Sequence, residues 1–99
     1  MTLAAFRRSL GQKTPAAGLS PALTALWWLG KDDWHKAHEL VADESGTDCA
    51  WVHAHLHRVE GDLDNARYWY RRARQEPARA ELAAEWAAIA AALLGSAHL

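Results

Sequence analysis

A pattern of helix, Gly-Asp turn and helix occurs twice in this 99-residue chain and constrains its fold more than any other feature. The two copies are LWWLGKDDWHKAHELV (26–41) and LHRVEGDLDNARYWY (56–70). Asp33 aligns with Asp62 and Ala37 with Ala66, so that each aspartate stands before a helix with a small alanine one turn in. Because a short turn between two helices makes them antiparallel neighbours, the pattern predicts two helical hairpins in succession.

Capping and stop signals extend this interpretation to the whole chain. Alanine is abundant and β-branched residues are few, which favours helix, and no alternating pattern of a strand is present. Thr2 and the pair Ser20-Pro21 are typical helix starts, and glycines mark helix ends. The expected helices run from Thr2 to Gly11, from Ser20 to Gly30, over roughly 33–44, from Thr47 or Asp48 to about Glu60, from Asp62 onward, and from Pro77 to Gly95. The predicted fold is therefore all-α, with about five to six helices.

A chain of this length predicts one domain, 1–99, with a limited core. Within it we expect an N-terminal short helix and loop (1–19), two helical hairpins (20–75) and a C-terminal capping helix (77–95). The chain contains six tryptophans, whose large rings are expected to supply much of the core.

The segment GDLDNARYWYRRA (61–73) resembles the second half of a tetratricopeptide or Sel1-like repeat. In that repeat a Gly-Asp turn leads into a helix with an alanine, a large aromatic residue and a second alanine, here Gly61, Asp62, Ala66, Tyr70 and Ala73. The resemblance covers roughly residues 26–74 and implies a tetratricopeptide-like α-solenoid fragment that binds a protein partner. Residues HLHR, EGD, NA and YWYRRA also make the whole chain similar to a group of short bacterial proteins, which implies no activity.

The chain departs from the family because its repeats are irregular in length and there are barely two of them. About three repeats are normally needed for a stable stack. The flanking helices are therefore expected to act as caps, or two chains to pair as a homodimer.

A cluster of histidines lies on the predicted central helices. His53 and His57 are four residues apart and share a helix face, and Glu60 follows three residues later. His38 points toward the same side from the preceding helix. A divalent, zinc-like metal bound by His38, His53, His57 and Glu60 is therefore one hypothesis. The alternative is that these histidines are half-buried and make hydrogen bonds to neighbouring side chains or carbonyls.

The turn between the second pair of helices is expected to carry a further polar cluster. If those helices are antiparallel, His57 and Glu60 come near Asn65 and Tyr68 across the turn. Such a cluster would lock the Gly61-Asp62 turn, or bind a ligand, a peptide carboxylate or a metal. Helix faces with Trp28, Tyr68, Tyr70, Arg71 and Arg72 are the expected protein-binding surface.

Charge is segregated along the chain although the net charge is only −1. Residues 32–48 are rich in Asp and Glu, and residues 67–79 are rich in arginine. This complementarity predicts salt-sensitive self-association, head to tail or as a homodimer. Nucleic acid is not an expected partner, because the arginine patch is one helix long and the chain is slightly acidic.

The sequence disfavours a membrane-spanning protein, a secreted protein and the common enzyme classes. The longest apolar run, residues 82–94, is interrupted by Glu85 and is too short for a membrane span. A single cysteine, Cys49, and the lack of a secretory pattern fit a cytoplasmic protein. The sequence contains no Gly-rich phosphate-binding loop and no nucleophile elbow, the motifs that would point to an enzyme. Cys49 lies on an inferred core stripe, so we expect a buried apolar residue there rather than a nucleophile. The sequence thus predicts a protein-interaction module without a cofactor, with a metal- or ligand-binding protein or an enzyme as the alternative.

Overall fold

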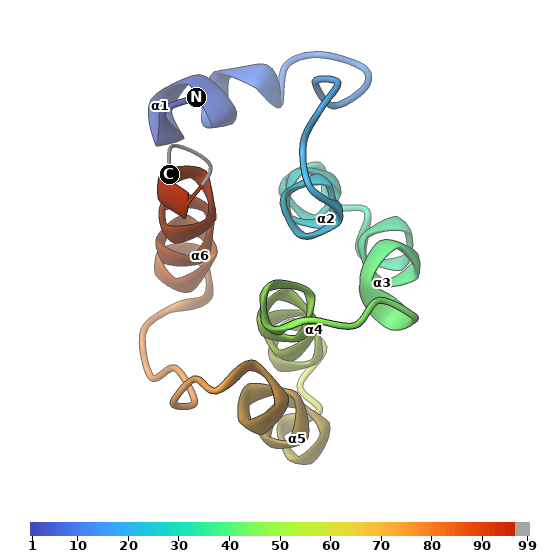
Figure 1. The fold of residues 1–99 in the computed structure, drawn as a ribbon, viewed down its shortest axis with the longest axis vertical. Coiled ribbons are helices and arrows are strands. Elements are labelled where there is room, and N and C mark those ends of the chain that lie inside the picture. Colours follow the sequence, from blue (N-terminus) through green and yellow to red (C-terminus); the bar gives the residue numbers. More distant parts are fainter. Residues whose placement is uncertain (97–99) are drawn as a thin grey trace.

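Six helices and no strand make up residues 1–96, the part of the chain that this computed structural model describes (Figure 1). The helices are α1 (Leu3–Ser9), α2 (Pro21–Gly30), α3 (Trp34–Ala42), α4 (Thr47–Val59), α5 (Leu63–Ala73) and α6 (Leu82–Ser96). The prediction of an all-α fold with about five to six helices is confirmed.

Four helices begin at the capping residues that the sequence indicates. Thr2 Oγ1 accepts a hydrogen bond from the Ala5 amide, and Ser20 Oγ accepts one from the Leu23 amide. The side chains of Asp33 and Asp62 cap α3 and α5 in the same way, since each accepts a bond from an amide three residues on. Each cap satisfies a backbone donor that the first helical turn would otherwise leave unpaired.

The two hairpin turns, α2–α3 and α4–α5, have the same backbone geometry. The Asp33 amide donates to the carbonyl of Trp28, and the Asp62 amide donates to the carbonyl of His57. The N–O distance is 2.9 Å in both hydrogen bonds. Asp32, with φ 63°, takes the left-handed conformation that Gly61, with φ 85°, takes in the other turn. The repeat seen in the sequence is therefore a repeat in three dimensions.

Two helix starts differ from the expectation. The N-cap of α4 is Gly46, without a side-chain cap bond, rather than Thr47 or Asp48. The last helix begins at Leu82 instead of Pro77. Arg74 ends α5 in a left-handed conformation, and residues 75–81 form a non-helical connection. The Arg58 side chain also donates to the carbonyl of Ala80, which holds this connection against α4.

The fourth helix is the centre of the packing, since α4 contacts α2, α3, α5 and α6. The chain returns along α6, which contacts both α1 and α2 (Figure 1). Fully buried side chains in this core include Phe6, Leu26, Trp27, Val52, Leu56 and Ile89. Of the six tryptophans only Trp27 is completely buried; the other five are half-buried, and Trp69 packs against a second cluster of Ala54, Ala66 and Tyr70. Across residues 1–96, no helix combines the length and apolar character needed to cross a bilayer.

Candidate functional site: a three-histidine cluster

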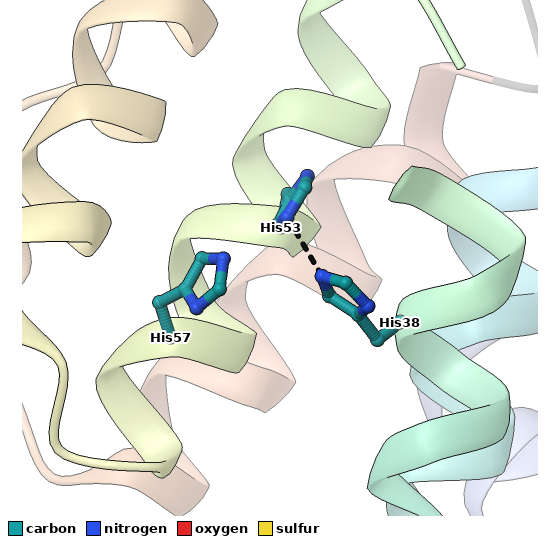
Figure 2. Close-up of side chains that lie close together, drawn as sticks. All are labelled: His38, His53 and His57. Atoms are coloured by element: carbon teal, nitrogen blue, oxygen red, sulfur yellow. Dashed lines mark hydrogen bonds between the residues drawn. The ribbon is translucent and has the colours of Figure 1, made fainter. Parts of the chain in front are cut away.

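Three histidine rings from two helices meet at the α3–α4 contact. His38 lies on α3, whereas His53 and His57 lie one turn apart on α4 (Figure 2). The Nε2 atoms of His38 and His53 are 3.1 Å apart and share a hydrogen bond. One ring nitrogen from each of the three histidines lies within 4.8 Å of the others. The packing of α3 on α4 therefore brings these side chains together.

Two indole rings support the cluster from either side. Trp34 stacks on His38, with ring centroids 4.9 Å apart and planes within 8°. Trp69, on α5, stacks on His53 at 3.9 Å and 17°. These contacts restrict the orientation of both imidazoles, because a stacked ring cannot rotate without losing its neighbour. The cluster is thus held by three consecutive helices.

Glu60 fixes the orientation and the tautomer of His57. His57 Nδ1 lies 2.6 Å from Glu60 Oε1, and a carboxylate in this position accepts the Nδ1 proton. Whenever this ring is neutral, its lone pair is on Nε2. His57 lies beside His38 and His53 (Figure 2), and one of its ring nitrogens is within 4.8 Å of a ring nitrogen of each. A carboxylate behind a histidine is the arrangement that orients histidine ligands at metal sites.

The cluster disfavours protonated imidazoles. Burial, and then the neighbouring His57 and His38, lower the pKa of His53 to about 4. Burial also lowers the pKa of His38, and the nearby His57 acts in the same direction. Both rings are therefore neutral at pH 7, the form in which imidazole binds metal ions.

One nitrogen in the cluster has an unusual environment. His53 Nδ1 is the one fully covered side-chain polar atom in the described part of the chain that lacks a hydrogen-bond partner. A buried polar group without a partner costs free energy, on the order of 1–3 kcal/mol. Such groups are rare in native proteins and call for an explanation beyond stability.

Two carboxylates lie at the outer edge of the cluster. Glu60 and Asp62 come within 4.8 Å of His57, and both are exposed. Asp62 already caps α5, so its side chain has a structural role.

The expected polar cluster across the α4–α5 turn does not form through hydrogen bonds. Asn65 is exposed, Tyr68 accepts a hydrogen bond from Arg72, and neither side chain forms a hydrogen bond with His57 or Glu60. The ring faces of Tyr68 and Trp69 are instead covered in part by the Arg72 guanidinium.

The expected protein-binding residues are placed differently from one another. Trp28 is half-buried, with the Lys36 ammonium 4.8 Å from the centre of its ring. Arg71 and Arg72 are exposed on α5. Tyr70 is not on an exposed face: it is buried, because its side chain turns toward α6 and donates a hydrogen bond to Glu85.

A second polar cluster, centred on Glu85, was not among the expected functional residues. The buried Glu85 carboxylate accepts hydrogen bonds from His55 (2.6 Å), Arg58 (3.1 Å) and Tyr70. Burial alone raises the pKa of Glu85, but the bonds from His55, Tyr70 and Arg58 outweigh it and leave this pKa lowered. The sequence did contain an indication of this cluster, because Glu85 is the charged residue of an otherwise apolar helix and lies one turn before the buried Ile89.

The environment of Cys49 argues against nucleophilic chemistry there. The side chain is buried. Burial, and then Glu44 and Asp48, raise the pKa of its thiol to about 11. Because the thiolate is the nucleophile, Cys49 is expected to act as a small apolar core residue.

Comparisons with protein-family models, with curated proteins and with solved structures find no match for this chain.

Proposed function

We propose that this protein binds a divalent transition metal ion such as zinc through His38, His53 and His57. The observation that carries the proposal is the 3.1 Å separation of His38 Nε2 and His53 Nε2 across two helices. Two imidazole nitrogens on one tetrahedral zinc ion, each about 2.0–2.1 Å from it, are separated by roughly 3.3 Å. A metal ion would replace the single proton that the two rings now share.

The rest of the cluster supports this function. The three imidazoles are preorganised by Trp34, Trp69 and Glu60. The lowered pKa values of His38 and His53 leave these two rings neutral at pH 7, so they need no deprotonation to bind a metal ion. Glu60 is already engaged with His57 Nδ1, so we assign it as the carboxylate that orients His57 rather than as a fourth ligand. A fourth position on the metal is then open to water or to another ligand.

The proposal is tested by isothermal titration calorimetry, in which Zn²⁺ is titrated into chelator-treated protein. We expect one ion per chain, and we expect Co²⁺ at the same site to give the visible absorption of a tetrahedral complex. His38→Gln should weaken binding more than 100-fold, and Glu60→Gln by about 10–100-fold. The matched control is His35→Gln, because His35 is exposed on the same helix and lies outside the cluster.

Two results would contradict the metal site. The first is no saturable binding of Zn²⁺ or Co²⁺ by the unmodified protein. The second is an affinity of His38→Gln equal to that of His35→Gln.

Self-association is a second candidate function, supported by the placement of charge. No ion pair joins the acidic stretch 32–48 to the arginine-rich stretch 67–79 within the described residues, and most of these side chains are exposed. A second copy or an acidic partner protein would neutralise the arginines of α5. Sedimentation velocity in low and high salt tests this, with a dimer expected at low salt and a monomer at high salt. A monomer under both conditions would exclude self-association.

A further inference from the structure

A cleft of about 530 Å³ lies away from the three-histidine cluster and shares no residue with it. Residues of α1, α2, α4 and α6, and of the turns that follow α1 and α2, line it. Its walls are mainly apolar and include Leu10, Leu29, Val59, Leu82 and Trp86. Clefts of this volume with apolar walls and few polar groups are typical of small-molecule sites.

The polar group inside this cleft is His55. Its Nδ1 atom lies 2.6 Å from the Glu85 carboxylate, which accepts the Nδ1 proton. In the neutral ring the lone pair is therefore on Nε2. Nε2 has no hydrogen bond within the described residues, and it is not among the fully covered atoms that lack a partner. The cleft thus contains a hydrogen-bond acceptor without a donor.

The acceptor is held in place from behind. Arg58 and Tyr70 also donate to Glu85, so the carboxylate cannot rotate away from His55 without breaking three hydrogen bonds. Glu85 and His55 are both buried, which leaves the ring little freedom. A rigid second layer of this kind is what positions a binding group.

The rim of the cleft carries one charge of each sign. Arg7 and Asp32 both line it and are exposed, and neither makes an ion pair within residues 1–96. Their opposite charges give the opening no net preference for an anion or a cation. The rim therefore supplies no net charge that would select a charged ligand over an uncharged one.

We infer that this cleft binds a small, uncharged, apolar molecule with one hydrogen-bond donor, of the phenol or indole class. The apolar body packs against Leu10, Leu29 and Trp86, and the hydroxyl or N–H group donates to His55 Nε2. The recognition is complementary in both respects, because the apolar walls remove water and the buried acceptor selects a molecule that can satisfy it.

The test compares two probes of similar size, phenol and toluene, on the unmodified, chelator-treated protein at pH 8. Binding is followed by two-dimensional NMR of ¹⁵N-labelled protein, with the Trp86 indole N–H as the reporter. Trp86 lines the cleft, and its Nε1 donates to the carbonyl of Leu26, which holds the reporter in place. We expect phenol to bind about threefold to tenfold more tightly than toluene, the effect of one neutral hydrogen bond.

Two substitutions at neighbouring positions distinguish binding in the cleft from binding elsewhere on α6. Ala83 lines the cleft, whereas Ala84 does not, and both are exposed. Ala83→Phe should fill the cleft and abolish the phenol-induced shift of Trp86, and Ala84→Phe should leave it unchanged. Equal binding of toluene and phenol would overturn the role of His55. No shift with either probe, or an unaltered shift in Ala83→Phe, would overturn the site.

Discussion

His38 and His53 meet across the contact between the two hairpins with their ring planes at 82° and their Nε2 atoms 3.1 Å apart. His38 belongs to the α2–α3 hairpin and His53 to the α4–α5 hairpin. A neutral imidazole has one proton for two nitrogens, so one ring donates in this contact and the other accepts. Whatever occupies this position, a proton or a metal ion, joins the two halves of the molecule.

Metal binding is expected to stabilise the fold, because the ligands come from two helices and the unfolded chain does not hold them together. At a free zinc concentration 100 times the dissociation constant, the stabilisation is about 2.7 kcal/mol. For a domain of this size that corresponds to a rise in Tm of about 10–20 °C. Calorimetric melting with and without Zn²⁺ measures it, and a similar rise in His38→Gln would show that zinc acts elsewhere.

Stability is expected to fall as the pH drops below about 6.5. Burial lowers the pKa of His53 from 6.5 to about 4 in the folded protein, so between these values the unfolded chain binds more protons. The contribution of His53 is fully present above pH 6.5 and is lost as the pH falls to about 4, by up to about 1.4 kcal/mol per pH unit. The lowered pKa of His38 acts in the same direction.

The variant His53→Phe tests the source of this pH dependence. Phenylalanine keeps the stacking on Trp69 but does not titrate. It also removes the unpartnered Nδ1 nitrogen. Urea unfolding of both proteins at several pH values between 4 and 7 should give a shallower slope for the variant. An identical slope would mean that other groups dominate.

Removal of the Glu85 charge is expected to destabilise the protein strongly. Glu85→Gln leaves the Arg58 guanidinium, of which only 17% of the side chain is exposed, without its anion. Loss of one partner in a buried ionic network costs about 3 kcal/mol or more. Glu81→Gln is the control, since Glu81 is exposed and should change the unfolding free energy by less than about 0.5 kcal/mol. Urea denaturation followed by circular dichroism compares the two, and equal effects would contradict a structural role for this network.

The two hairpin turns predict a reciprocal pair of substitutions. Asp32 takes the left-handed conformation that glycine prefers, so Asp32→Gly should stabilise the fold by about 0.5–1 kcal/mol. Gly61→Ala should destabilise it by about 1 kcal/mol through the backbone alone, because a Cβ at Gly61 meets no atom within 4 Å. Thermal melting measures both, and changes of the same sign would argue against equivalent turns.

Interactions close in the sequence could be predicted before the structure was known. The caps of Thr2, Ser20, Asp33 and Asp62 depend on amides three residues away, and the spacing of His53, His57 and Glu60 follows from the helix itself. The approach of His38 to this pair could also be anticipated, since it required only that consecutive helices pack face to face. The pairing of Glu60 with His57 Nδ1 depends on a side-chain rotamer, which the sequence does not specify.

By itself the sequence determined the all-α class, most helix starts and the repeated turn, because these follow from backbone hydrogen bonding and apolar spacing within a few residues. Only the tertiary structure decided that Tyr70 is buried, that α6 begins at Leu82, and that His55 and Glu85 meet behind a cleft. His55 and Glu85 are far apart in the chain, and they meet only because α6 returns to pack on α4. No local pattern encodes that register, since it is set by the fit of whole helix surfaces against one another.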